Sequence, residues 1–501
     1  ETAPPAVIVP PNQPSTSVSV TVQSLFAPIA QGANAQIVLP TNAQSDCTVT
    51  ETEVEGWFGG TITAGGAVSP PAFTQIDTNS SVCDFYIWGA QIFLWLTSPD
   101  GAGTVLEGDS IFTVNTSDWT LFADGDQPMQ MATRQEKDDD IGGISQTDSQ
   151  AGVLMSQEGS LVYYGVHVND VYGYFLTGQK CGAENGQANC TDPATPYLQT
   201  KNFPYDQGHL DAVVTFAKDH LGVDTVPDED VLVLELKTSW VDASTLADQT
   251  GYVIIEGTVP AFEQTSDTLW TQSGSQDLSL ALVGMHIVAT VQNHPEFVWA
   301  TFEHMNNTPM APYFYDGSDF MPTTFQAEND FLFFPKGGTI DGANLECMGV
   351  KNGNIAALTD ASGALNCAGG IVPSKTVRMF PWGNPSMTQT GAVTSNNAML
   401  IKLNRSVLGA LAEGDPRAQY FQLGSIWTSI PDGATTAPVP NQGMFSYYSM
   451  RGSLSLSNST METYTQGSTC FDCHSVGSAT DEDFGLSHIY SKIAPLPVPT
   501  P

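Results

Sequence analysis

Apolar and polar residues alternate with a period of two along several stretches of the chain. Such alternation is typical of strands that bury one face of a sheet, and it occurs in residues 17–26, 35–40, 231–240, 250–259, 278–292 and 296–304. Helical spacing is rarer, and it predicts helices over residues 83–99, 210–222, 404–415 and 458–466. The last of these opens with Ser459 and has Glu462 three residues later, which is the pattern of a capping box.

These elements predict a β-rich α+β protein with a large antiparallel sheet as its body and a few helices. Residues 1–30 are rich in Pro, Ser and Thr and are expected to form an extended segment. Residues 31–455 are expected to form the main body. Residues 456–501 are expected to form a short C-terminal module that ends in a Pro-rich tail.

The net charge of the chain indicates which classes of binding partner are unfavourable. It has 15 Lys and Arg against 53 Asp and Glu, a net charge of −38. Such a polyanion is not expected to bind nucleic acid, and no apolar run approaches the roughly 20 residues that span a bilayer. The chain begins "ETAPPAVIVPP", without Met or an apolar signal core, which we interpret as a mature N-terminus after signal removal.

Six of the eight cysteines form three pairs whose members lie close in sequence: Cys47 with Cys83, Cys181 with Cys190, and Cys347 with Cys367. Six cysteines allow fifteen connectivities, and nearness in sequence favours this one. Three disulfides imply an oxidising compartment, so we expect a periplasmic or secreted protein.

The remaining two cysteines lie in "GSTCFDCHSVG", residues 467–477. Cys470 and Cys473 are spaced so that both thiols can reach the two vinyl groups of one haem, and His474 follows where its imidazole can bind the iron. This C-x-x-C-H pattern predicts one covalently attached haem c, with His474 as the proximal ligand.

Two other interpretations of this stretch stay open. Half of a zinc site would need two more Cys or His ligands, and His488 is the only nearby candidate. A thioredoxin-like redox pair would need a strand before it and a long helix after it, whereas a polar loop follows His474. Haem c is therefore favoured.

Six stretches, in order over most of the chain, carry a resemblance to a known family: "FYIWGAQIFLWLTSP", "AGVLMSQEGSLVYYGVHVND", "LVLELKTSWV", "LVGMHIVATVQNHPEFVWATFEHMNNTP", "YFQLGSIW" and "LSNSTMETYTQGSTCFDCHS". The chain resembles secreted bacterial proteins labelled cytochrome c family, which have a single C-terminal C-x-x-C-H. This resemblance implies a haem-c-bearing extracytoplasmic protein and implies no particular reaction.

Two ionisable residues interrupt an apolar strand, and they are the first candidates for catalysis. Glu235 and Lys237 are two residues apart and therefore face the same side of the strand. If they line a cavity, the pair could bind a haem propionate or a substrate carboxylate. The alternative is that this face of the strand is solvated.

Two histidines flank the expected hairpin turn at "QNHPE" and are further candidates. His286 and His304 could come together on one face of the sheet. One of them would then be the distal ligand or an acid–base residue at the haem, or both would form a non-haem metal site with Glu303 or His294. The alternative is that they are hydrogen-bonded core histidines.

Other distal ligands come from the C-terminal part of the chain. His488 lies fourteen residues after His474 and could fold back as a sixth ligand. Met450 and Met461 are further candidates.

Three functions fit these features. An oxidoreductase using peroxide or oxygen chemistry at the haem is favoured, because the chain is far longer than electron carriage requires and could enclose a small-molecule substrate. An electron-transfer cytochrome with six-coordinate haem would instead serve a redox partner. A self-assembling structural subunit of the cell surface is the third alternative.

Overall fold

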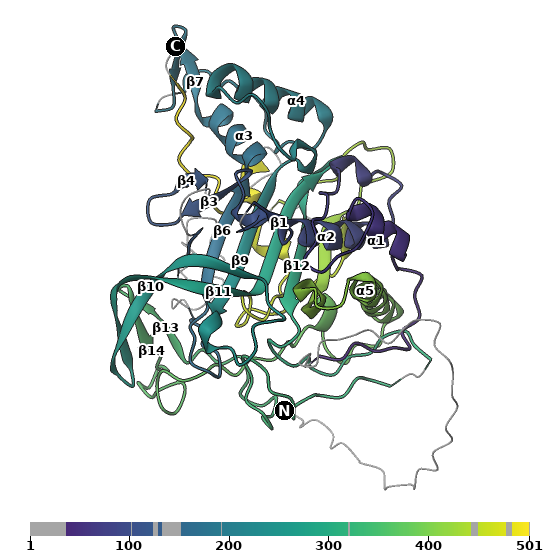
Figure 1. Cartoon of the computed structure of the whole chain (residues 1–501), viewed down its shortest axis with the longest axis vertical. Coiled ribbons are helices and arrows are strands. Elements are labelled where there is room, and N and C mark those ends of the chain that lie inside the picture. Colours follow the sequence, from purple (N-terminus) through teal and green to yellow (C-terminus); the bar gives the residue numbers. More distant parts are fainter. Residues whose placement is uncertain are drawn as a thin grey trace, which may run out of the picture.

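The structure is a computed structural model of the whole chain, and it describes residues 37–101, 103–123, 129–132, 152–191, 193–318, 321–441, 449–476 and 483–499. One large sheet forms its centre (Figure 1). The main path of this sheet runs, in spatial order, through β16 (Met450–Gly452), β15 (Tyr420–Thr428), β12 (His294–His304), β11 (Leu269–Val291), β9 (Leu234–Asp242), β6 (Tyr163–Asn169), β3 (Ile111–Asn115) and β4 (Thr120–Ala123).

Neighbouring strands along this path are antiparallel. The expected class, a β-rich protein with a large antiparallel sheet and a few helices, is therefore confirmed. The alternating stretches at 231–240, 250–259, 278–292 and 296–304 contribute to β9, β10 (Ile254–Ser266), β11 and β12. Residues 37–40 form no strand, so that prediction is wrong there, and the stretch at 17–26 lies outside the described residues.

A long arm extends from the sheet because β11 is much longer than its neighbours β9 and β12 (Figure 1). The outer part of β11 pairs with β10 and with β14 (Asn354–Ala357), which pairs with β13 (Met348–Lys351). Side chains on the outer part of this arm are largely exposed. Short strands complete the described set: β5 (Met129–Gln130) beside β10, β1 (Pro99–Asp100) with β2 (Gly103–Thr104), and β7 (Gly182–Glu184) with β8 (Gln187–Asn189).

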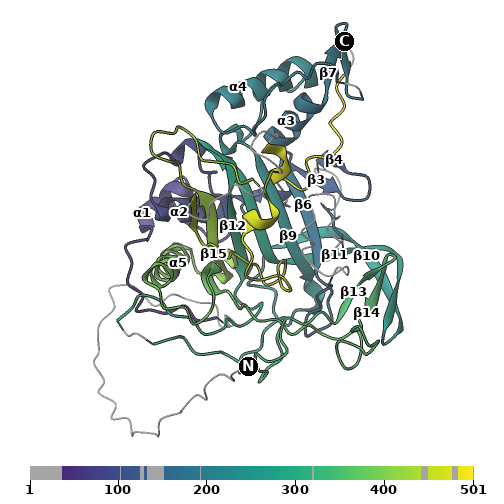
Figure 2. The ribbon, with the colours of Figure 1, turned by 180° about the vertical axis from the view of Figure 1, so that it is seen from behind.

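Helices cover one face of the sheet at β12 and β15. The described helices are α1 (Glu51–Trp57), α2 (Val82–Leu96), α3 (Asp170–Lys180), α4 (Gln207–Phe216), α5 (Gly391–Ala410) and α6 (Cys470–Cys473). α2 lies against β12, where Phe93 stacks on Phe302 with ring centroids 4.4 Å apart. The C-terminal segment, residues 453–476 and 483–494, crosses the opposite face (Figure 2). Every residue of β12 is buried, as expected for a strand covered on both faces.

Local sequence signals account for most of these helices. α2 begins at a capping box formed by Ser81 and Asp84. The helix predicted at 210–222 is α4 with its continuation to Leu221, and Gly222 caps it in the left-handed conformation with φ 72°. The helix predicted at 404–415 is the end of the longer α5.

The helix predicted over residues 458–466 does not form, because the chain makes turns there. The Glu462 side chain bonds Asn458 rather than Ser459: its Oε2 accepts from the Asn458 amide at 2.9 Å. The backbone is instead fixed by bonds to the sheet beneath it. Asn458 Nδ2 donates to Thr301 Oγ1 at 2.9 Å and to the Phe302 carbonyl at 3.0 Å.

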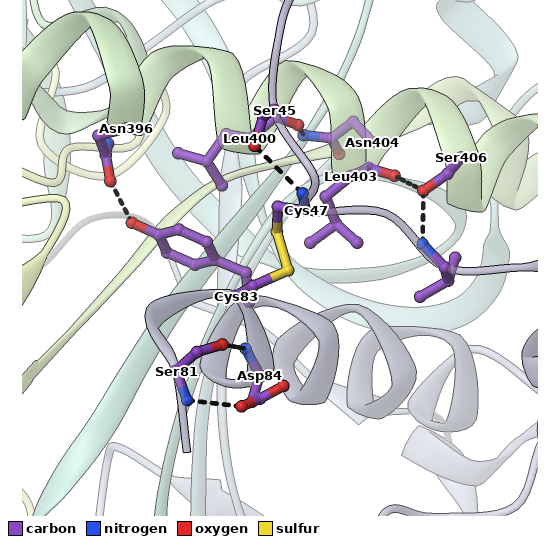
Figure 3. Close-up of a disulfide and its surroundings, with 12 residues drawn as sticks. Ser45, Cys47, Ser81, Cys83, Asp84, Asn396, Leu400, Leu403, Asn404 and Ser406 are labelled. Carbon is purple, nitrogen blue, oxygen red and sulfur yellow. Dashed lines mark hydrogen bonds between the residues drawn. A yellow bond between two sulfur atoms is a disulfide. The ribbon is translucent and has the colours of Figure 1, made fainter. Parts of the chain in front are cut away.

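The three expected disulfides are present: Cys47–Cys83, Cys181–Cys190 and Cys347–Cys367. In Figure 3 the Cys47–Cys83 bond joins the first described segment to the start of α2, beside α5. Ser406 of α5 fixes the same segment by accepting from the Val49 amide at 3.0 Å. Three disulfides are compatible with an oxidising, extracytoplasmic compartment.

Among the described residues, no helix is both long and apolar enough to cross a membrane.

A buried ion pair anchors the C-terminal segment to the sheet. Glu303 of β12 and Arg378 are both fully buried and paired through Oε2 and Nη2. Ser459 donates its backbone N–H to Glu303 Oε1 at 2.6 Å, and its hydroxyl also bonds this carboxylate. Asn307 Nδ2 donates to Oε2 at 3.2 Å. The carboxylate thus joins Arg378, β12 and the C-terminal segment.

We expect Arg378→Met to destabilise the protein by about 3–5 kcal/mol, because it leaves the Glu303 carboxylate buried without its counter-charge. The double variant Glu303→Gln, Arg378→Met should be less destabilised than the single variant. Thermal unfolding followed by circular dichroism measures this. The control is Lys336→Met, which breaks the exposed Lys336–Asp330 pair and should cost below about 1 kcal/mol. Equal losses in Lys336→Met and Arg378→Met would contradict the anchoring role.

Candidate functional site

The face of β9, β11 and β12 beneath the C-terminal segment, here called the site face, is built of three rows of side chains. Strand register defines each row, because paired residues of neighbouring strands lie side by side on one face. The first row is Glu235, Val288 and Trp299; the second is Lys237, His286 and Thr301; the third is Ser239, Gly284 and Glu303. Three of the four predicted catalytic residues, His286, Glu235 and Lys237, therefore share one face.

The third row fixes the C-terminal segment closely to the sheet. Ser239 Oγ and Thr460 Oγ1 are 2.7 Å apart, and Ser459 binds Glu303. Glycine is required at 284, because a Cβ there would lie 2.7 Å from Thr460 Oγ1 and 3.0 Å from Asn458 Nδ2. The turn at 458–460 can approach the backbone only because this position has no side chain.

The C-x-x-C-H motif lies over the first row. α6 is a single turn with Thr469 and Asp472 as its capping box. Cys470 and Cys473 occupy its two ends, are partly exposed, and lie outside the three described disulfides. The His474 ring follows the helix and lies against Trp299, with ring centroids 4.3 Å apart.

The orientation of the His474 ring is set by a backbone carbonyl. Its Nδ1 is 2.8 Å from the Leu486 carbonyl oxygen. A carbonyl can only accept, so Nδ1 carries the proton and the lone pair of a neutral ring is on Nε2. Histidines that bind metals usually donate their other ring N–H in this way. Covalent haem c requires two thiols one turn apart for attachment. It also requires an imidazole that can bind the iron, here through Nε2.

His488 lies beside His474 rather than across from it. The two rings stack with centroids 3.8 Å apart and an interplanar angle of 14°. His488 Nε2 lies 3.0 Å from the Cys473 carbonyl oxygen. The role of His488 as a sixth haem ligand stays a prediction. The two methionine candidates, Met450 and Met461, are buried.

A charged cluster occupies the second row beside the motif. Both carboxylate oxygens of Glu462 lie 3.0 Å from His286 Nε2, and both side chains keep partial exposure, 24% for Glu462 and 22% for His286. Burial alone would raise the pKa of Glu462. The His286 ring and then the Lys237 ammonium outweigh burial and hold this pKa at about 2. Glu462 is therefore ionised throughout the physiological range.

Glu235 and Lys237 face the same side, as predicted, and have different partners. The Lys237 ammonium lies 5.6 Å from the ring centroid of Tyr164, and its charge lowers the pKa of Glu462. Glu235 hydrogen bonds Ser487 of the C-terminal segment, and its Oε2 is enclosed without a hydrogen-bond partner among the described residues. Burial raises the Glu235 pKa to about 7, against the opposing effect of Ser487. Glu235 can therefore hold or release a proton near neutral pH.

The expectation that His286 and His304 meet on one face is wrong. His286 pairs with Thr301, and His304 is three residues further along β12, so the two side chains project from opposite faces. His304 is also five residues from Trp299, which is about 16 Å along a strand. The structure thus places His304 apart from His474, and a metal site shared by His286 and His304 is excluded by the register.

His304 has the environment of a hydrogen-bonded core histidine. Its Nε2 is 3.1 Å from the Gly251 carbonyl, and its Nδ1 accepts from the Asn306 amide at 3.1 Å. The ring stacks on Tyr252 with centroids 3.8 Å apart. Burial lowers the pKa of His304 to about 3, so the ring is neutral. This is the alternative that the sequence left open.

Three residues of the site were not expected from the sequence as partners of these groups: Trp299, Glu462 and Ser487. The signal for Trp299 is its spacing, because it lies two residues before Thr301 on the same face of β12. Glu462 and Ser487 gave no such signal, because they reach the site face only through the path of the C-terminal segment.

Within the described residues, no group of three or more His, Cys, Asp or Glu side chains is arranged to hold a metal ion. Comparison with known proteins identifies no relative: no family model, no curated protein and no solved structure matches the chain. The resemblance to the cytochrome c family stays a prediction.

We expect Glu235→Gln to stabilise the protein at pH 8. The folded-state pKa is raised from 4.5 to about 7, so the stability that protonated Glu235 contributes is complete below about pH 4.5 and is lost as pH rises to about 7. Gln keeps the neutral form, and the gain at pH 8 should be about 1–3 kcal/mol. It should be smaller at pH 5.5. Thermal melts at both pH values measure it.

Glu462→Gln is the matched control and should act in the opposite direction. The pKa of Glu462 is lowered to about 2, so its contribution is present above about pH 4.5 and is lost as pH falls towards 2. This variant should be destabilised at pH 7. If Glu235→Gln kept the pH dependence of the unchanged protein, Glu235 would not hold a proton in the fold.

Proposed function

We propose that this chain is an extracytoplasmic mono-haem c oxidoreductase. Cys470 and Cys473 would bind the haem covalently, and His474 would be its proximal ligand. The observation that carries the proposal is the 2.8 Å contact of His474 Nδ1 with the Leu486 carbonyl, because it assigns the tautomer in which the lone pair that binds iron is on Nε2.

Haem c supplies one-electron chemistry, and where an axial position is open it also supplies peroxide or oxygen chemistry. The residues of the site face fit the second use. Lys237 provides positive charge in a strongly acidic protein, and the ionised Glu462 lies against His286. An anionic or polar substrate at this partly exposed cluster would find charge partners beside the motif.

Glu235 supports a role in proton transfer near the motif. Its carboxyl group bonds Ser487, whose Oγ is 2.8 Å from the Tyr172 hydroxyl. Ser487 directly follows Leu486, whose carbonyl accepts from His474. A partly buried group with a pKa of about 7 is matched to proton exchange at neutral pH. Reduction of oxygen or peroxide consumes protons, so such a group is useful to an oxidoreductase.

An electron-transfer cytochrome is the second candidate, and the exposure of the motif favours it. Cys470, Cys473 and His474 are each partly exposed, so a haem edge attached there would be accessible to a redox partner. Electron transfer requires such access and no substrate cavity. The two functions differ in the coordination of the iron, which a spectrum distinguishes.

The test is expression in a host with haem c maturation, followed by a haem-stained denaturing gel and an optical spectrum. We expect one covalent haem per chain and a high-spin ferric spectrum that changes with peroxide. A low-spin spectrum unaffected by cyanide or peroxide would favour the electron-transfer cytochrome. If no covalent haem formed in a folded protein, both candidates would be rejected.

Variants assign the residues. Cys470→Ala with Cys473→Ala should abolish covalent haem, whereas His474→Ala should keep the stain and lose the native spectrum. The double variant Cys181→Ser, Cys190→Ser removes two cysteines of the disulfide beside β7 and β8 and should keep both signals. Loss of haem in this control as well would show a general folding defect.

A further inference from the structure

Asp170 is an unusual carboxylate distant in sequence from every residue of the site. It is the first residue of α3 and is only 1% exposed. Its Oδ1 accepts from the Val171 amide at 2.7 Å, while its Oδ2 is enclosed and has no hydrogen-bond partner among the described residues. A buried carboxylate oxygen without a partner is costly. No group among the described residues offsets that cost, whereas a bound proton or cation would do so.

A second carboxylate approaches the same place from another segment. Asp228 precedes β9, and its Oδ2 lies 3.5 Å from Ser110 Oγ. The Ser110 carbonyl accepts from the Asp170 amide at 2.9 Å. Ser110 therefore contacts the backbone of Asp170 and the side chain of Asp228.

A third acid lies close by. Asp100 of β1 rests against Gly108, where a Cβ would lie 2.6 Å from Asp100 Oδ2. Gly108 is two residues from Ser110, and the charge of Asp100 acts on Asp228. Asp100 is exposed, so it adds negative charge near Asp228 and is not a candidate ligand.

The charges that act on these acids are negative. Asp228 and Glu229 raise the pKa of Asp170 further after burial, to about 8, and Asp100 and Asp230 raise that of Asp228 after burial. Mutual repulsion of this kind is relieved when a cation binds among the acids. With 15 Lys and Arg in 501 residues, the chain has few cations of its own for this purpose.

We propose that Asp170 and Asp228, with Ser110, bind a divalent cation that prefers oxygen ligands, such as Ca²⁺. The Asp170 Oδ2 would be its buried ligand and Asp228 its partly exposed one. Ca²⁺ accepts hydroxyl, carbonyl and water oxygens alongside carboxylates, so two acids with neutral oxygens suffice. The bound ion would join the start of α3 to the loop before β9 and would therefore be structural.

The test is a thermal melt of the full chain at pH 7.5 in 150 mM NaCl, with 1 mM CaCl₂ or with EDTA, together with calorimetric titration of Ca²⁺. We expect one site and a rise in Tm of about 3 °C or more with Ca²⁺. Asp170→Asn should abolish the rise, and Asp228→Asn should weaken Ca²⁺ binding at least about tenfold. The partly exposed position of Asp228 makes this second variant informative even if Asp170→Asn does not fold.

The control is Glu263→Gln on the arm, which removes one exposed negative charge and should keep the full effect. Absence of any Ca²⁺ effect in the unchanged protein would overturn the proposal and leave Asp170 as a buried acid that keeps its proton. Binding that persists in both Asp170→Asn and Asp228→Asn would also overturn it, because it would show diffuse attraction to a polyanion.

Discussion

The buried Glu303 carboxylate is the contact on which the arrangement of the site depends. It binds Arg378 on one side and the backbone and hydroxyl of Ser459 on the other. Residues 458–460 are thereby fixed over the third row, which in turn directs Glu462 to His286 and carries the chain towards α6. A fully buried ion pair thus ties the segment that leads to the motif to the central strand.

The fold was largely predictable wherever a local pattern determines the structure. Alternation at period two located β9, β11 and β12, and helical spacing with caps located α2 and α4. The sequence-based predictions failed where tertiary contacts determine the local structure. The capping pattern at 458–466 exists, yet hydrogen bonds to Thr301 and the Phe302 carbonyl hold that segment in turns. Local propensity is weak beside such contacts.

The site was predictable only within single strands. Glu235 and Lys237 had to share a face because they are two residues apart, and the register adds His286 to that face. Spacing within one strand did not predict the position of His304. His304 lies three positions after Thr301, the pairing partner of His286, and an odd difference places its side chain on the opposite face. Composition does not reveal this register. The partners Glu462 and Ser487 depend on how a distant segment crosses the sheet.

Three carboxylates with enclosed oxygens in this acidic protein are compensated in three different ways. Glu303 has an arginine and several donors. Glu235 has a hydrogen bond from the Ser487 hydroxyl. Its pKa is raised to about 7, so a bound proton neutralises much of its charge near neutral pH. Asp170 has one backbone N–H, and its charged neighbours are acids. Those neighbours favour a proton on Asp170, but they attract a divalent cation more strongly, because two positive charges interact with several carboxylates at once. The same repulsion that makes the acids unfavourable without an ion therefore gives the position its affinity for one.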